Sequence, residues 1–146
     1  MTATQISPDS LSLTCDKLIN APQDAVFNAW LDPAMLARFM MPGPNMTVPH
    51  AATDPTEGGR FEIVMKAGDD EIPHAGTYKE IDPHSRIVFT WESPFSIDGS
   101  TVTLSFDQEG DGTRVTLNHV RFASEEARNN HEGGWSAILA ALGEAL

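Results

Sequence analysis

The strongest constraint on the fold is a long segment in which apolar and polar side chains alternate. Between Gly58 and Phe122, five runs place an apolar residue at every second position, as in Phe61, Ile63 and Met65. A period of two puts successive side chains on opposite faces of a strand, so that one face is buried. Turn-forming residues separate the runs, and the segment therefore predicts an antiparallel meander of five strands.

The segments on either side of this meander follow other patterns. Leu11–Ile19 alternates and predicts a first strand, and two short amphipathic helices follow it, the second opening at Asp32–Pro33. Pro42–Pro44 ends that helix in a loop. After Ser124, apolar residues recur at helical spacing, which predicts a long last helix. The order of elements predicts an α+β domain with about six strands.

The composition is that of a globular chain with a strongly acidic surface. The 146 residues are 40% apolar and 21% charged, and nine basic against 21 acidic residues give a net charge of −12. Such a chain is long enough to bury a core, and phosphate backbones and anionic membranes repel its surface. We expect one domain over residues 11–146 after a flexible lead-in of residues 1–10, with no binding to nucleic acid or membranes.

The sequence also indicates the compartment. Cys15 is the only cysteine, so the chain forms no internal disulfide. The first ten residues have neither the basic start nor the apolar stretch of a signal peptide. No run approaches the roughly 18 apolar residues of a membrane span. We therefore expect a cytoplasmic protein.

Two segments resemble metal-binding motifs without completing them. His131–Trp135 begins like the HExxH helix of zinc proteases, but a tryptophan takes the place of the second histidine. Asp107–Gly112 resembles the first half of a calcium loop, but Asn118 stands where a bidentate Glu is needed, so a hairpin turn is favoured. We expect no metal and no cofactor, and we assign no catalytic residue.

Methionines gather around the loop that follows the second short helix. Met35, Met40, Met41 and Met46 accompany Phe39 in this part of the chain. Methionine is flexible and polarisable, so it suits the mouth of a pocket that adapts to apolar ligands. The same property lets it fill gaps over a core, and both interpretations remain open.

Polar and small residues mark a second candidate region. His119 continues the inward register of Val115 and Leu117, and Tyr78 can face the same side from its own strand. A few polar groups on an apolar face are typical of small-molecule sites, although a buried histidine is more often a satisfied core residue. Gly133–Gly134 weakens the last helix, which indicates close approach by the sheet or by a ligand, with sheet packing favoured.

The combined motifs resemble a known family. They are Ala21–Pro22, Val26–Phe27, Asp32–Pro33, Gly58–Phe61, Gly76–Ile81, Arg86–Trp91, His119 and His131–Trp135. Over residues 11–146 this series resembles the family of homologues of the activator of heat-shock-protein-90 ATPase, within the START/birch-allergen superfamily. The resemblance implies a helix-grip fold, in which a curved antiparallel sheet wraps around a long C-terminal helix. The space between them often holds lipids, polyketides or steroids.

The implied fold gives a set of candidate ligand-binding residues. They share an inward position on the sheet, on the last helix or near the methionine-rich loop. The set is Trp30, Phe39, Met40, Met46, Phe61, Ile63, Met65, Tyr78, Phe89, Trp91, Leu104, His119, Trp135 and Leu139.

Three functions compete at this stage. The first is non-enzymatic binding of a small hydrophobic ligand, such as a lipid, a polyketide or an aromatic compound. The second is a cyclase-like or dehydratase-like enzyme, with His119 or His131 as general acid/base, helped by Tyr78 or Glu62. The third is a co-chaperone-like module that binds a chaperone or another protein through its acidic surface. A homodimer is compatible with all three.

Overall fold

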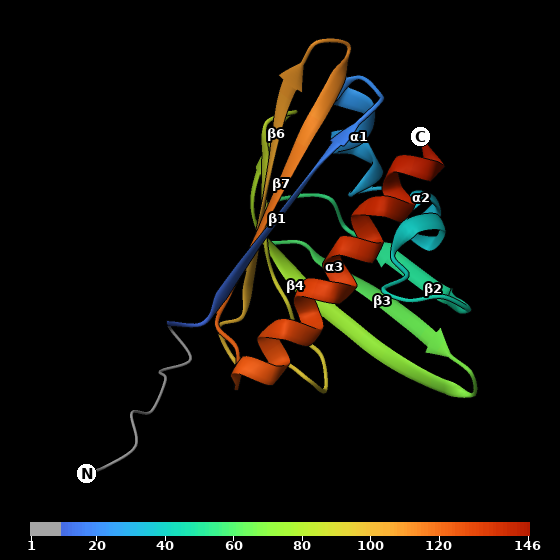
Figure 1. Cartoon of the computed structure of the whole chain (residues 1–146), viewed down its shortest axis with the longest axis vertical. Coiled ribbons are helices and arrows are strands. Elements are labelled where there is room, and N and C mark those ends of the chain that lie inside the picture. Colours follow the sequence, from blue (N-terminus) through green and yellow to red (C-terminus); the bar gives the residue numbers. More distant parts are fainter. Residues whose placement is uncertain (1–9) are drawn as a thin grey trace.

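A computed structural model describes residues 10–146, and its elements follow the predicted order (Figure 1). The predicted lead-in lies outside the described residues except for Ser10. The elements are β1 (Ser12–Ile19), α1 (Gln23–Ala29), α2 (Pro33–Phe39), β2 (Met46–Thr53), β3 (Arg60–Ala67), β4 (Asp70–Asp82), β5 (Arg86–Thr90), β6 (Thr101–Glu109), β7 (Gly112–Val120) and α3 (Glu125–Ala145).

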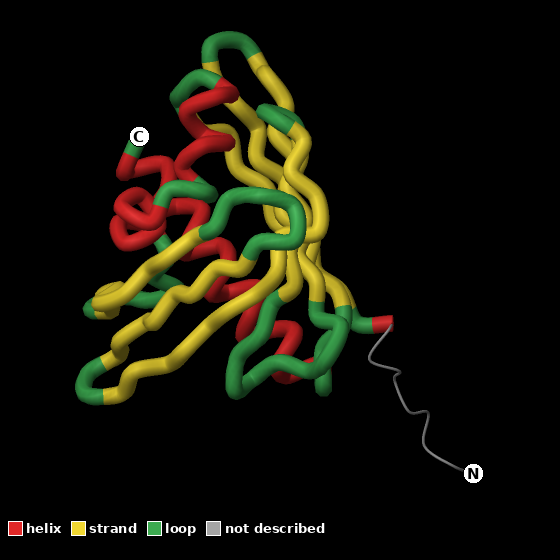
Figure 2. The backbone as a smooth tube through the Cα atoms, turned by 180° about the vertical axis from the view of Figure 1, so that it is seen from behind, coloured by secondary structure: helices red, strands yellow, loops and turns green. Residues whose placement is uncertain are grey.

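The strands form one antiparallel sheet in the order β1-β7-β6-β5-β4-β3-β2. The sheet is curled, and α3 runs diagonally along its concave side (Figure 1). Seen from behind, the β3–β4 hairpin extends away from the strands of the other half of the sheet (Figure 2). The predicted α+β helix-grip architecture is confirmed, with seven strands in place of about six.

The additional strand is β2, where the sequence pattern predicts a loop. Its burial alternates poorly, and Pro49 lacks the N–H group that a ladder needs. Pairing with β3 shifts register between Thr47 and His50, so two residues of β2 stand opposite Met65. This bulge accommodates the proline at a sheet edge. Pairing with β3 therefore stabilises a strand whose own pattern does not predict one.

β4 is longer than its sequence pattern suggested. The alternating pattern of the sequence predicts this strand only from Gly76, whereas the structure begins it at Asp70, directly after the turn at Gly68. Pro73 interrupts the sequence signal, but Ile72 pairs with Met65 and continues the ladder. This extension carries two side chains, Ile72 and His74, to the end of the sheet that faces α3.

The core lies between the concave face of the sheet and the helices. Alternate residues of β5, β6 and β7 point into it, and α3 contributes its own apolar face. At the other end of the sheet, Phe27 of α1 packs edge-on against Phe106 of β6, with ring centroids 5.3 Å apart. The α3 residues in the core are Trp135, Ile138, Leu139 and Leu142. Burial of a side chain of this size contributes about 1.5–3 kcal/mol.

The helix starts follow the predicted capping residues. Asp32 Oδ1 accepts a hydrogen bond from Ala34 N at 2.9 Å, and Ser124 Oγ accepts one from Ala127 N at 3.1 Å. Each bond satisfies one of the free N–H groups in the first turn.

No helix among residues 10–146 is both long and apolar enough to cross a membrane.

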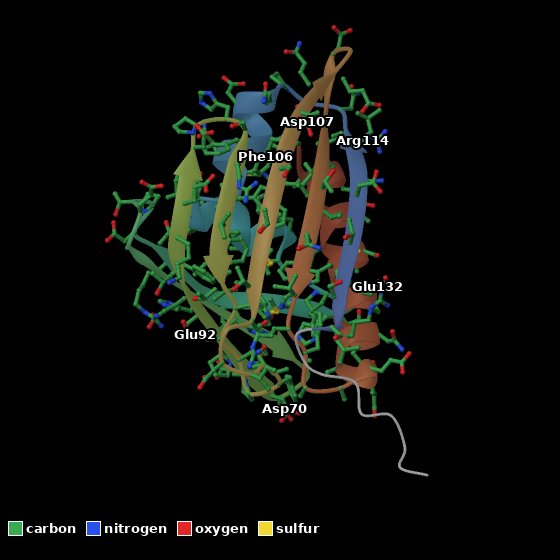
Figure 3. All side chains as sticks on the ribbon, turned by 90° about the vertical axis from the view of Figure 1, so that its left-hand side faces the viewer. Asp70, Glu92, Phe106, Asp107, Arg114 and Glu132 are labelled. Carbon is green, nitrogen blue, oxygen red and sulfur yellow. The ribbon has the colours of Figure 1, made fainter. Side chains whose placement is uncertain are left out.

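The outer face of the sheet is polar (Figure 3). Arg114 of β7 lies there and bonds Glu109 at 2.8 and 3.0 Å and Asp16 of β1 at 2.8 Å. The predicted hairpin turn between β6 and β7 is confirmed, since Asp107 pairs with Arg114 and Glu109 with Gly112. The sheet thus has one apolar face, and any apolar ligand within the fold must lie on the α3 side.

Candidate ligand-binding cavity

A cavity of about 460 Å³ lies between α3 and the β3–β4 part of the sheet. Small-molecule sites are commonly clefts of about 300–1,000 Å³ with mostly apolar walls. The lining residues are Pro42, Met46, Met65, Ile72, His74, Trp91, Phe95, Ser124, Glu126, Ala127, Asn130, His131, Gly134, Trp135 and Ile138. The cavity therefore has the size and the wall chemistry of a ligand site.

The periods of the sheet and the helix explain why these side chains meet. Met65 and Ile72 are direct partners in the β3–β4 ladder, and His74 follows Ile72 on the same face. Ala127 and His131 are one helical turn apart on α3, so they line one side of that helix. The sheet thus forms one wall of the cavity and the first half of α3 forms the other.

Aromatic rings form the inner wall. Trp91, directly after β5, is almost fully buried, and its ring centroid lies 4.9 Å from that of Trp135 on α3. The His74 imidazole lies 5.0 Å from Trp91 on another side. Such tilted pairs add about 0.5–1.5 kcal/mol beyond burial of area. At the mouth, Phe95 is 61% exposed, which is unusual for a phenylalanine.

The two imidazoles in the wall each have one nitrogen bonded to backbone. Nδ1 of His131 lies 2.7 Å from the Ala127 carbonyl oxygen, and Nδ1 of His74 lies 3.1 Å from the Ile72 carbonyl oxygen. Burial lowers the pKa of His74 to about 4, with a smaller contribution from His131. His74 is therefore uncharged at neutral pH.

His119 faces the interior as predicted, but it lies behind the cavity wall in the core. Trp135 Nε1 donates to its Nδ1 at 2.9 Å, so Nε2 carries the hydrogen and donates to Ser100 Oγ at 2.6 Å. Burial lowers the pKa of His119 to about 3, with a smaller contribution from His131. With both nitrogens bonded, the imidazole fixes the orientation of Trp135, which lines the cavity.

The structure separates the predicted ligand-binding residues into three groups. Met46, Met65, Trp91 and Trp135 line the cavity. Trp30, Met40, Phe61, Ile63, Tyr78 and Phe89, together with Trp91, enclose a void of about 10 Å³, too small for an organic ligand. Phe39, Leu104, His119 and Leu139 are buried in the core.

This separation has a physical cause in α1 and α2. These short helices place large side chains such as Trp30 over one half of the concave face, and Trp30 packs against Phe39 with ring centroids 5.0 Å apart. That half is therefore filled by the chain itself. Met40, expected near a pocket mouth, is buried in this filled half.

Sequence reasoning missed several lining residues. Ile72, His74 and Phe95 are the main ones, and His131 entered only as a candidate acid/base. Ile72 and His74 alternate in phase with Tyr78, so the period of two could have found them had Pro73 not interrupted the pattern. Phe95 lies in a loop, where no periodic signal exists.

The paired glycines of α3 have a different explanation from the one expected. The sheet approaches neither of them. A Cβ atom on Gly134 would lie 3.1 Å from Pro42 Cβ, and one on Gly133 would meet no atom within 4 Å. Gly134 therefore lets the loop after α2 approach α3 at the cavity, and the expectation of close sheet packing was wrong.

The fold and the cavity together define a helix-grip protein. The chain belongs to the family described as activator of Hsp90 ATPase homolog 1-like protein, which it matches over residues 20–146. The predicted family is confirmed. Family and fold support a ligand-binding or regulatory domain in general.

Solved structures show the same fold. An AHSA1-like protein from Aeromonas hydrophila is 25% identical, with a TM-score of 0.81 over 92% of this chain and 91% of that one. A protein from Nitrosomonas europaea is 22% identical, with a TM-score of 0.79 over 93% and 94%. CalU16 from Micromonospora echinospora is 27% identical, with a TM-score of 0.70 over 92% and 74%. No curated protein matches the sequence.

Proposed function

We propose that the protein binds a small hydrophobic molecule, without converting it, in the cavity between α3 and the β3–β4 part of the sheet. The observation that carries this proposal is the cavity of about 460 Å³ with its largely apolar wall. Removing apolar ligand surface from water contributes about 25 cal/mol per Å², so burying roughly 200 Å² gives about 5 kcal/mol before ordering costs.

The contacts of two of the candidate acid/base groups, His119 and Glu62, favour binding over catalysis. Both nitrogens of His119 are bonded within the core, to Ser100 and Trp135. Glu62 lies on the outer face of β3, where it is 3.4 Å from His50, and therefore faces away from the cavity. The geometry gives His119 a structural role and leaves Glu62 outside the site.

The proposal is tested with a variant that fills the cavity. Ala127 lines it from α3, so Ala127→Trp puts an indole into the ligand space. Ala140 is exposed on the same helix, and Ala140→Trp is the matched control. Native mass spectrometry detects a co-purified ligand, and thermal shift is then measured against a panel of fatty acids and aromatic compounds.

We expect a ligand to stabilise the wild type and the Ala140→Trp variant. Stabilisation is about 2.7 kcal/mol at a concentration one hundred times Kd. Ala127→Trp should lose this response, because the indole occupies the space. If neither a bound mass nor a thermal shift is found in the wild type, or if Ala127→Trp responds as the control does, the cavity is not the binding site.

A further inference from the structure

We propose that the cavity selects planar aromatic ligands that donate a hydrogen bond, such as aromatic alcohols, and discriminates against carboxylates. This inference rests on the proposed function, because it concerns the polarity of a ligand in the same cavity. It follows from which polar atoms the cavity wall presents, and from their protonation.

The first such atom is Nε2 of His131. A backbone carbonyl oxygen only accepts hydrogen bonds, so the short contact with Ala127 places the ring hydrogen on Nδ1. In the neutral form of the ring, Nε2 is then an acceptor. Among the described residues no group bonds this nitrogen. Its lone pair is available to a ligand hydroxyl.

His74 lies on the opposite wall, but its ring has more backbone neighbours than that of His131. Its Nδ1 donates to the Ile72 carbonyl oxygen, and the Ile63 backbone also interacts with the ring. Burial keeps this ring uncharged at neutral pH. The acceptor that the cavity offers to a ligand is therefore assigned to Nε2 of His131, and His74 contributes an uncharged ring from β4.

The charges around the cavity oppose an anionic ligand. None of the lining residues is Lys or Arg, and the one carboxylate among them is Glu126. The N-terminus of α3 would attract an anion, but Glu125 and Glu126 already compensate its dipole. Ser124 and Asn130 can each donate or accept, so they favour neither sign. The net charge of −12 acts in the same direction as Glu126.

The shape of the wall favours a flat ring. Trp91 lies between two other rings of the wall, because its centroid is 4.9 Å from that of Trp135 and 5.0 Å from that of His74. Aromatic ligands gain from offset or edge contacts with such rings. A ring between α3 and β4 brings its substituents toward the imidazoles.

The test compares three naphthalenes that differ in one substituent. 2-Naphthol donates a hydrogen bond, 2-methoxynaphthalene does not, and 2-naphthoate carries a carboxylate. Binding affinities are measured by isothermal titration calorimetry at about pH 8, where ordinary imidazoles are uncharged. We expect 2-naphthol to bind about fivefold more tightly than the methyl ether, the gain from one hydrogen bond. 2-Naphthoate should bind at least about tenfold more weakly than 2-naphthol.

Substitutions at His131 and Glu126 test which side chains cause the selection. His131→Phe removes the acceptor while keeping a ring, and should abolish the preference for 2-naphthol over its methyl ether. His131→Gln restores an acceptor oxygen, and should recover most of the preference. Glu126→Lys places a cation at the exposed mouth, and should strengthen 2-naphthoate binding about fivefold or more. Glu126 is exposed, so this variant tests the charge argument even if His131→Phe fails to fold.

The outcomes separate the two proposals. If no naphthalene binds while a compound of the ligand panel still stabilises the wild type, the selection is overturned and the proposed function stands. If neither a naphthalene nor any compound of the panel binds, both proposals fail. If all three bind and 2-naphthoate equals or exceeds 2-naphthol, the cavity binds ligands but the selection is overturned. Equal affinities for 2-naphthol and its methyl ether would also overturn the selection, because they would show that the imidazoles accept no hydrogen bond from the ligand.

Discussion

At the scale of single residues, His119 links the core to the cavity. Its Nδ1 accepts a hydrogen bond from Trp135, so a proton can add there only if this bond is lost. Burial accordingly lowers the pKa of His119 to about 3 and that of His74 to about 4. In the unfolded chain both imidazoles titrate near the ordinary value of about 6.5.

This difference makes the free energy of unfolding depend on pH. Below about pH 6.5 the unfolded chain binds more protons than the folded one, so stability falls as the pH falls. Each histidine contributes up to about 1.4 kcal/mol per pH unit, until the pH reaches its folded-state pKa. Urea unfolding between about pH 7 and pH 5 should show this loss.

His119→Phe removes the contribution of one imidazole. The slope of unfolding free energy against pH should decrease by about 1.4 kcal/mol per unit between about pH 6 and pH 5. The variant is also less stable at pH 7, since Trp135 and Ser100 lose their partner. A slope identical to that of the wild type would mean that His119 is protonated in the folded protein.

At the scale of elements, α3 combines a strong start with a weak centre. Ser124 caps the helix, and Glu125 and Glu126 stabilise its first turn. Gly133 and Gly134 lie within the helix, where glycine costs about 1 kcal/mol relative to alanine. Only Gly134 has a neighbour that explains it, namely Pro42.

Gly133→Ala should therefore stabilise the protein by about 0.5–1 kcal/mol. The added methyl group meets no atom within 4 Å, so nothing has to move. Gly76→Ala is the opposite case, because its Cβ would overlap the Thr90 carbonyl oxygen and the Phe61 ring. Thermal unfolding of both variants compares a free site with a blocked one. A lower Tm for Gly133→Ala would contradict this expectation, because it would mean that the added methyl group meets an unfavourable contact.

At the scale of the whole molecule, the excess of negative charge opposes the compact state. Arg114 lies on the outer face of the sheet (Figure 3). Its ion pair with Glu109 joins two largely exposed side chains, so solvent screens the pair and it contributes little. Acidic residues outnumber basic ones by twelve, so the carboxylates repel one another on balance. Repulsion among them extends over the screening length of the solution.

Stability should accordingly increase with salt. Between about 10 and 150 mM NaCl the screening length falls from about 30 to 8 Å, and we expect Tm to rise by about 2–4 °C. Differential scanning calorimetry at constant pH measures this. A fall in Tm over the same range would show that the ion pairs of the outer face outweigh the repulsion.

The parts of the fold that were predictable are those in which local pattern and tertiary packing agree. β3, β5, β6 and β7 alternate cleanly because one face of each is buried against the same core. α3 follows helical spacing and begins at a capping serine. β2 and the first half of β4 were missed because Pro49 and Pro73 interrupt the alternation, and hydrogen bonds to β3 form these strands nonetheless.

The fold class and the inward face of most strands follow from residue periods that the chain carries locally, and the combined motifs indicate the family. Where the concave face is open depends instead on tertiary packing. Most of the predicted ligand-binding residues were chosen for an inward position, but α1 and α2 fill one half of the concave face, and the cavity lies in the other half, beneath the first turns of α3. Whether inward side chains meet each other or enclose space depends on how far apart the elements lie, and no local period encodes that distance.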